Sequence, residues 1–171
     1  RTKVLFDTNQ LLQKAKSEEE IFSLTASQLM KLLNRSLIVY LEQNGGLGAE
    51  QVFGVDGETA QNIFSAPEER DAANWTFANK KRSGAGTDSY PDAKGLYLAL
   101  RTGGGVFGVI GIDLSEKPLD AFENSVLLSI LGEGALAIEN RRNALEKEQA
   151  ALQARNEELR ANLLRTISHD L

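Results

Sequence analysis

The first 33 residues repeat apolar positions at the period of an α-helix, in two stretches that meet near Ser17. The earlier stretch, residues 1–16, carries its apolar positions at Val4/Leu5, Leu11/Leu12 and Ala15. The later stretch opens with Ser17-Glu18-Glu19-Glu20, which has the form of a capping box. It continues as an apolar stripe made of Phe22, Ala26, Leu29 and Leu33. We expect a linker helix over 1–16 and a second helix that covers a sheet.

Two antiparallel hairpins are predicted further along the chain. Residues 37–41 are β-branched and aromatic, Asn44-Gly45-Gly46 supplies a turn, and residues 52–55 form the returning strand. In the second hairpin, leucines alternate with other residues over 96–101, glycines 103–105 turn the chain, and residues 106–112 pair back.

The segment between the hairpins predicts a helix and a loop. Residues 67–82 begin with proline and acidic residues and end with basic ones, as the helix dipole favours. The apolar stripe of this segment is weak, so we expect the helix at the rim of the core. Residues 83–92 are loop-rich, with room for a short strand.

The pattern changes after Pro118. Residues 119–171 contain no proline, and glycine occurs there only at 132 and 134, so one long helix is predicted. Apolar residues recur every seven positions at Leu131, Ile138, Leu145, Leu152 and Leu159. The matching positions of the heptad are Leu128, Ala135, Arg142, Gln149, Asn156 and Leu163. This is the pattern of a coiled coil with polar residues in its middle, and it predicts a parallel dimer.

A second interpretation stays open for the first part of this helix. Over 119–138 a broad apolar face could equally pack against the chain's own domain. That face is formed by Phe122, Val126, Leu127, Ile130 and Leu131.

The amino-acid composition excludes several kinds of functional site. The absence of cysteine excludes disulfides, thiolate metal sites and cofactors attached through sulfur. Nineteen basic against 24 acidic residues give a net charge of −5 without a basic block, so we expect no nucleic-acid partner. The single histidine lies three positions from the end, so we expect no histidine-based metal or haem site inside the fold.

That histidine, His169, has a feature that favours reactivity. Successive helical residues turn by about 100°, so His169 points away from the stripe that contains Leu163 and Ile167 and is exposed. Asp170 can hold the proton on one ring nitrogen and leave the lone pair of the other free as a nucleophile. The alternative is an ordinary solvated histidine near a helix end.

The last nine residues, LLRTISHDL, resemble the phosphoacceptor box of sensor histidine kinases. In that family the histidine attacks the γ-phosphate of ATP, the next acidic residue assists as acid or base, and the phosphoryl group passes to a response regulator. The resemblance implies His169 as phosphoacceptor and Asp170 as its assistant. We expect the chain alone to be inactive and to hold no cofactor, because the ATP-binding kinase domain is outside it.

The order of predicted elements resembles a GAF domain, an α+β fold with a central antiparallel sheet flanked by helices. More narrowly, Asn74-Trp75-Thr76-Phe77-Ala78-Asn79 followed by Gly84-Ala85-Gly86-Thr87-Asp88 resembles the GAF segment of KdpD-type sensor kinases of potassium uptake. This implies a homodimer, a response regulator of the KdpE type and the cytoplasmic portion of a membrane sensor.

The resemblance also implies a ligand pocket. We take Trp75, Thr87, Asp88 and Tyr97 as its candidate residues, with no metal. The glycine-rich loop over 84–88 could present backbone N–H groups to an anion, and its alternative is a tight connection into a strand. The alternative for Trp75 is a core anchor. Gly108 and Gly111 permit close approach by a ligand or, alternatively, by packed side chains.

These expectations give four segments: a linker helix over 1–16, a GAF domain over 17–138, a coiled coil over 139–160 and the start of the phosphoacceptor helix over 161–171. The predicted function is transmission of a signal from the GAF domain to a sensor kinase that regulates potassium uptake. The alternatives are a free-standing small-molecule receptor and a dimerisation module without ligand.

Overall fold

The computed structural model describes the backbone of residues 2–170 and the side chains of residues 7–170. The elements are α1 (Thr2–Gln13), α2 (Glu18–Leu33), β1 (Leu37–Gln43), β2 (Gly46–Phe53), α3 (Gly57–Phe64), α4 (Pro67–Asn79), β3 (Ser83–Gly84), β4 (Gly95–Thr102), β5 (Gly105–Asp113) and α5 (Ala121–Asp170). The chain divides into two units, Arg1–Ile138 and Glu139–Leu171, and α5 contributes to both.

The first unit is built on one five-stranded antiparallel sheet, in the order β2-β1-β5-β4-β3. Both predicted hairpins are present. The β1–β2 turn places Asn44 and Gly45 at positive φ, 53° and 83°, as a tight hairpin turn requires. The two central strands, β1 and β5, join the hairpins, so the sheet is continuous from one edge to the other.

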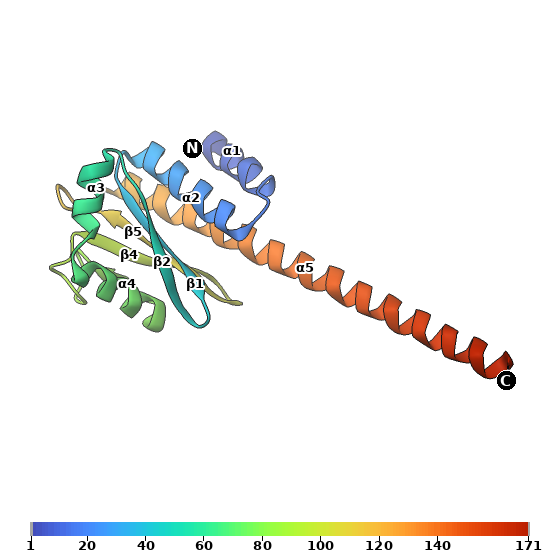
Figure 1. Ribbon diagram of the computed structural model, residues 1–171. Helices are drawn as coiled ribbons and strands as arrows, with labels where there is room; N and C mark the ends of the chain where they lie inside the picture. The colour runs from blue at the N-terminus through green and yellow to red at the C-terminus, as the bar shows by residue number, and fades with distance from the viewer. Residues whose placement is uncertain (1, 171) are drawn as a thin grey trace. The chain divides into compact units, whose positions relative to one another are not determined.

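Helices cover both faces of this sheet (Figure 1). On one face, α2 and the first part of α5 pack on the larger hydrophobic core, which includes Phe22, Leu29, Leu98, Ile110 and Ile130. On the other face, α3 and α4 cover a smaller core that includes Ile38, Tyr40, Ala72, Tyr97 and Val109. Alternate residues of β1 therefore serve different cores, as the period of a strand dictates.

The helices α1 and α2 follow the predicted pattern. In α2 the serine half of the capping box is present, because Ser17 Oγ accepts from the Glu20 N–H at 3.1 Å, while the Glu20 carboxylate accepts from the Lys16 N–H at 3.0 Å. In α1, Leu12 is buried in the larger core, whereas Leu11 is 39% exposed. The side chains of Val4 and Leu5, on which the predicted stripe also depends, lie outside the described residues.

Two expectations about the α3–α4 face are corrected. The short helix α3 was not predicted, because its sequence GETAQNIF is too short to show a helical period. The helix α4 ends at Asn79 rather than at 82 and does not lie at the rim. Its Ala72, Ala73 and Thr76 are fully buried, because small side chains let the helix backbone approach the sheet closely.

The helix α5 resolves the alternative left open for residues 119–138. Leu127, Ile130, Leu131 and Ile138 are buried within the first unit, so this part packs on its own domain. Phe122 is the exception, with 58% of its surface exposed. By length and composition alone α5 contains a window apolar enough to cross a membrane, and 44% of that window is buried inside the structure.

Candidate functional site

Arg35 lies where the larger core meets the beginning of α5. It follows Asn34, which ends α2 in the left-handed conformation with φ 53°, and it precedes β1. The left-handed residue reverses the chain direction. The guanidinium is thereby directed at the connection between β5 and α5, and only 7% of the residue is exposed.

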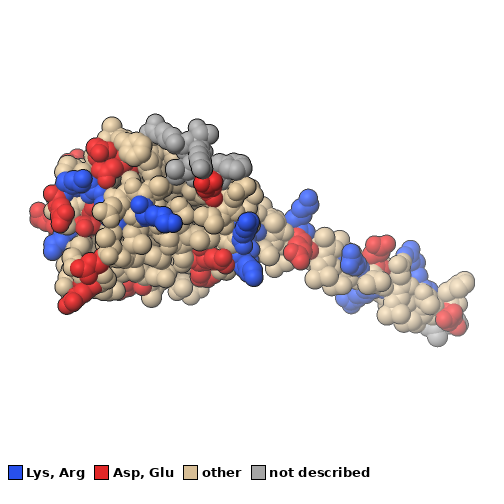
Figure 2. Space-filling model, turned by 90° about the horizontal axis from the view of Figure 1, so that it is seen from above, with Lys and Arg blue, Asp and Glu red and all other residues tan. Residues whose placement is uncertain are grey.

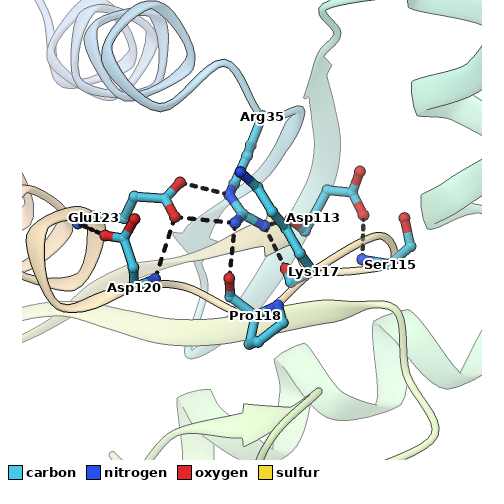
Figure 3. Close-up of polar contacts among 7 residues, drawn as sticks. All are labelled: Arg35, Asp113, Ser115, Lys117, Pro118, Asp120 and Glu123. Carbon is cyan, nitrogen blue, oxygen red and sulfur yellow. Dashed lines mark hydrogen bonds and ion pairs between the residues drawn. The ribbon is translucent and has the colours of Figure 1, made fainter.

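The guanidinium of Arg35 makes five hydrogen bonds (Figure 3). Nε and Nη2 donate to the two carboxylate oxygens of Glu123, at 2.9 and 3.2 Å. Nη1 donates to the carbonyl oxygens of Asp113 and Lys117, at 2.9 and 2.8 Å, and Nη2 also donates to that of Pro118, at 3.0 Å. Five is the number of N–H donors that an arginine carries, so this group is fully satisfied.

Glu123 is also part of the N-terminal cap of α5. Its N–H donates to Asp120 Oδ1 at 2.8 Å, and its own Oε1 accepts from the Asp120 N–H at 3.2 Å, which is a reciprocal capping box. The hydrogen bond from Arg35, opposed by burial, holds the pKa of the Glu123 carboxyl below its ordinary value of 4.5.

One side chain thus fastens three parts of the domain: the end of α2, the irregular connection 114–120 and the first turn of α5. We call this group, Arg35 with Asp113, Lys117, Pro118 and Glu123, the Arg35 junction. These bonds connect the end of β5 and the end of α2 to the beginning of α5.

A cavity of about 500 Å³ lies beside the junction and shares part of its lining with it. Arg35, Asp113 and Lys117 of the junction line it, together with Asp56 and Thr59 of the α3 start. The remaining lining residues are Leu33, Asn34, Ser36, Val55, Ile63, Ser115 and Glu116. No group of three or more acidic or histidine side chains within the described residues has the arrangement of a metal site.

The opposite face of the sheet contains a buried carboxylate that the sequence did not indicate. Glu69 is 2% exposed and accepts three hydrogen bonds, from Tyr97 Oη at 2.7 Å, the Gly95 N–H at 3.0 Å and the Lys94 N–H at 2.9 Å. At the sequence level Glu69 counted only as an acid of the first turn of α4. Its side chain instead turns inward and ties α4 to the start of β4.

The two buried tyrosines of this face are held in the neutral form. Burial is the largest cause that raises the pKa of Tyr97, and the Glu69 carboxylate raises it further. Burial also raises the pKa of Tyr40 to about 12, although Arg70, whose guanidinium carbon lies 5.0 Å from the ring centre, opposes this. Aromatic and alanine side chains therefore fill the space between the sheet and α4.

The candidate pocket residues lie in different surroundings. Tyr97 is fully buried against Glu69, and Trp75 is half-buried on α4. Thr87 Oγ1 lies 2.8 and 2.9 Å from the carbonyl oxygens of Gly84 and Ser89 in its own loop, and its one hydroxyl proton is donated to one of them. Asp88 is exposed. A ligand role for these four residues stays a prediction.

Gly108 and Gly111 are explained by side-chain packing. A Cβ added at Gly108 would lie 2.4 Å from the Tyr40 carbonyl oxygen and 2.7 Å from the Phe22 ring of α2, and one added at Gly111 would lie 2.4 Å from the Tyr97 ring. These distances are shorter than any ordinary carbon contact. The two glycines thus admit a ring on each face of β5.

In the second unit, the leucines of the predicted heptad have exposed side chains. Leu145, Leu152, Leu159 and Leu163 are 44–61% exposed, and Ile167 is 47% exposed. Charges of both signs alternate along this unit in the view of Figure 2, without a block of one sign. The predicted seam is corrected at its beginning, because Leu131, Ala135 and Ile138 are buried in the domain and cannot face a partner helix.

His169 and Asp170 lie on the last turn of α5, and both are exposed, as the helical geometry predicted for the imidazole. This exposure is shared by every residue over 143–170 and does not by itself distinguish His169. No described residue packs over the imidazole, so a nucleophilic nitrogen there is accessible to a phosphoryl donor.

Comparison with known proteins finds a similar sequence and several solved structures with a similar fold. No family model matches the chain. The sensor protein KdpD of Clostridium acetobutylicum is 34% identical over 172 aligned residues, which take in 100% of this chain and 19% of that protein. The chain thus spans about a fifth of the length of this relative.

Solved structures of GAF domains have a similar fold. The GAF domain of the potassium sensor histidine kinase KdpD from Escherichia coli superimposes with a TM-score of 0.58 at 20% identity, covering 89% of this chain and 99% of that one. This chain has a GAF fold, and its sequence is similar to one segment of a KdpD sensor protein. The GAF domain of an Acinetobacter phosphoenolpyruvate-protein phosphotransferase gives a TM-score of 0.57 at 11% identity, covering 83% and 94% of the two chains.

The assignment confirms the α+β fold class and the GAF resemblance. Within this GAF fold, three buried charged residues were missed by sequence reasoning: Arg35, Glu69 and Glu123. Only Glu123 had a usable signal, because Asp120-Ala121-Phe122-Glu123 has the spacing of a capping box.

Proposed function

We propose that this KdpD-type GAF domain transmits a signal from its sheet to a phosphoacceptor histidine at the end of α5. The parent protein is a sensor histidine kinase that regulates potassium uptake, and this chain is its cytoplasmic GAF portion within a membrane sensor. The observation that carries the proposal is the 34% identity to a KdpD sensor protein along the whole chain, the helix that ends in Ser168-His169-Asp170 included.

Transmission begins at the Arg35 junction. The junction is buried and fully hydrogen-bonded, so a rearrangement of α2 or of the cavity beside it cannot leave the first turn of α5 unchanged. A ligand in that cavity would contact Arg35, Asp113 and Lys117, which belong to the junction itself.

Transmission continues through a parallel dimer of the second unit. Four exposed leucines at heptad-compatible positions support the pairing of two copies of this helix. Gln149 and Asn156 interrupt the seam, so the pairing is marginal, and a coupling free energy of about 1–3 kcal/mol is enough to shift it.

At the end of the dimer, an imidazole nitrogen of His169 attacks the γ-phosphorus of ATP and ADP leaves. Asp170 accepts the proton from the other ring nitrogen, which returns the phosphorylated imidazole to the neutral form. ATP is bound by the kinase domain of the parent protein, and the phosphoryl group passes to an aspartate of a KdpE-type response regulator.

The test is labelling of the full-length protein with γ-labelled ATP. Wild type should acquire phosphate that is labile in acid and stable in alkali, and His169→Gln should acquire none. The 171-residue chain alone should stay unlabelled under the same conditions, because it lacks the kinase domain. Retained acid-labile phosphate in full-length His169→Gln would refute the assignment.

A further inference from the structure

A shallow groove on the last turns of α5 is lined by Leu164, Arg165, Ser168 and His169. Arg165 precedes His169 by four residues, which puts the two side chains on the same face about one turn apart. Both residues are exposed. An arginine and the proposed phosphoacceptor therefore share one hollow of the helix surface.

In the free helix the guanidinium of Arg165 bonds toward the N-terminal side of this face, so it has to leave Asn162 to reach a phosphoryl group on His169. Its Nη2 donates to Oδ1 of Asn162, which lies seven residues before His169 and about 20° from it around the helix axis. The other described charges near this face are Asp170, adjacent to the histidine, and Glu158, about three turns earlier. Arg165 is the cation one turn from the imidazole.

We propose that Arg165 binds the phosphoryl group carried by His169. The inference rests on the proposed function, in which His169 accepts that group. A phosphoryl group adds close to two negative charges and three acceptor oxygens, and the planar guanidinium matches two of those oxygens at once. Arg165 thus fixes the direction in which the phosphoryl group is offered to the response regulator.

The sign of its electrostatic effect follows from charge. Protonation of the phosphorylated imidazole adds a positive charge, and the positive guanidinium disfavours it. Arg165 therefore lowers the pH at which phosphohistidine takes up its proton. For two exposed charges about one helical turn apart, the shift is about 0.5 pH unit at low salt.

The experiment uses this chain and phosphoramidate, which needs no kinase domain. An imidazole nitrogen attacks phosphorus, the P–N bond of phosphoramidate breaks, ammonia leaves, and the ring proton is transferred to it as ammonium. Because the chain has one histidine, the phosphohistidine signal in the ³¹P spectrum comes from His169 alone. The measurement is the midpoint of that signal in a pH titration.

We expect Arg165→Gln to raise the midpoint by about 0.5 pH unit, and Arg165→Lys, which keeps the charge, to retain at least half of the wild-type effect. The difference should vanish in 1 M NaCl, where charges are screened within about 3 Å. Arg160→Gln is the matched control, because Arg160 lies nine residues before His169, on the opposite side of the helix.

Equal midpoints for wild type and Arg165→Gln at low salt would overturn the proposal, as would an equal shift in Arg160→Gln. Labelling by ATP plays no part in this titration. Failure of the proposed function would appear in the full-length labelling experiment, and failure of the Arg165 proposal would appear here.

Discussion

At the scale of single residues, Arg35 stabilises the domain through partners that are distant in sequence. Its partner Glu123 is 88 positions away, and side-chain exposures of 7% and 12% show that both groups have lost most of their water. Removing one member of such a pair leaves the other desolvated and unpaired, which costs more than the pair itself contributes.

The first prediction concerns this pair. Arg35→Met should lower the free energy of unfolding in urea by about 3 kcal/mol, because Glu123 and three backbone carbonyls lose their donor. Glu50→Gln is the control, since the Arg70–Glu50 pair is largely exposed and its loss should cost less than about 1 kcal/mol. Equal losses in the two variants would contradict the assigned role of Arg35.

The second prediction concerns pH. The folded state lowers the pKa of Glu123 below 4.5, so its contribution to stability is present above that pH and is lost as the pH falls through the folded-state pKa. The difference in unfolding free energy between wild type and Glu123→Gln should therefore be largest near pH 7 and shrink toward pH 3. A difference that stays constant over this range would show that the carboxylate charge contributes nothing.

Residue roles of this kind are largely hidden in the sequence. From sequence alone, an arginine after a helix is expected to lie at the surface, and an acidic residue in a first turn is expected to interact with the helix dipole. Arg35 and Glu69 depart from these expectations because the sheet brings distant backbone donors and acceptors to them. Such partners cannot be deduced from local pattern.

At the scale of elements, the β5 strand depends on glycines that admit aromatic rings. A third prediction follows: Gly111→Ala should destabilise the domain by about 1–3 kcal/mol, because the added Cβ would lie 2.4 Å from the Tyr97 ring. Gly103→Ala is the control, since nothing lies within 4 Å of its added Cβ. The measurement is the midpoint temperature of thermal unfolding. Equal midpoints for the two variants would contradict the packing role of Gly111.

The exposed seam of the second unit gives a fourth prediction. Gln149→Leu with Asn156→Leu should strengthen helix pairing, because both positions belong to the polar middle of the heptad pattern. The dissociation constant from sedimentation equilibrium should fall at least tenfold. Glu158→Leu adds the same side chain outside the seam and should leave that constant within about twofold.

The elements themselves were mostly predictable. Long periodic segments such as α2 and the two hairpins show their period plainly, whereas α3 spans too few residues to show one. The heptad pattern also extended too far toward the N-terminus. Leu131 and Ile138 fit both a coiled-coil seam and a core, and only tertiary structure shows that the core takes them.

At the scale of the whole molecule, a GAF domain with a packed core on each face of its sheet continues into a helix whose leucines after residue 138 are exposed. The domain's own residues bury the early part of the predicted seam, so the proposed pairing of two copies would have to use residues after 138. The GAF fold was predictable from element order. The junction that couples it to α5 was not, because it depends on contacts between segments far apart in sequence.

The most direct test of the central claim is the mass of the intact chain in solution, measured by light scattering across a range of concentrations. The account predicts a dimer of twice 18.7 kDa at high concentration, and single chains of 18.7 kDa for Leu152→Glu combined with Leu159→Glu. A wild-type chain that stays single throughout, or a double variant that still pairs, would contradict transmission through this helix.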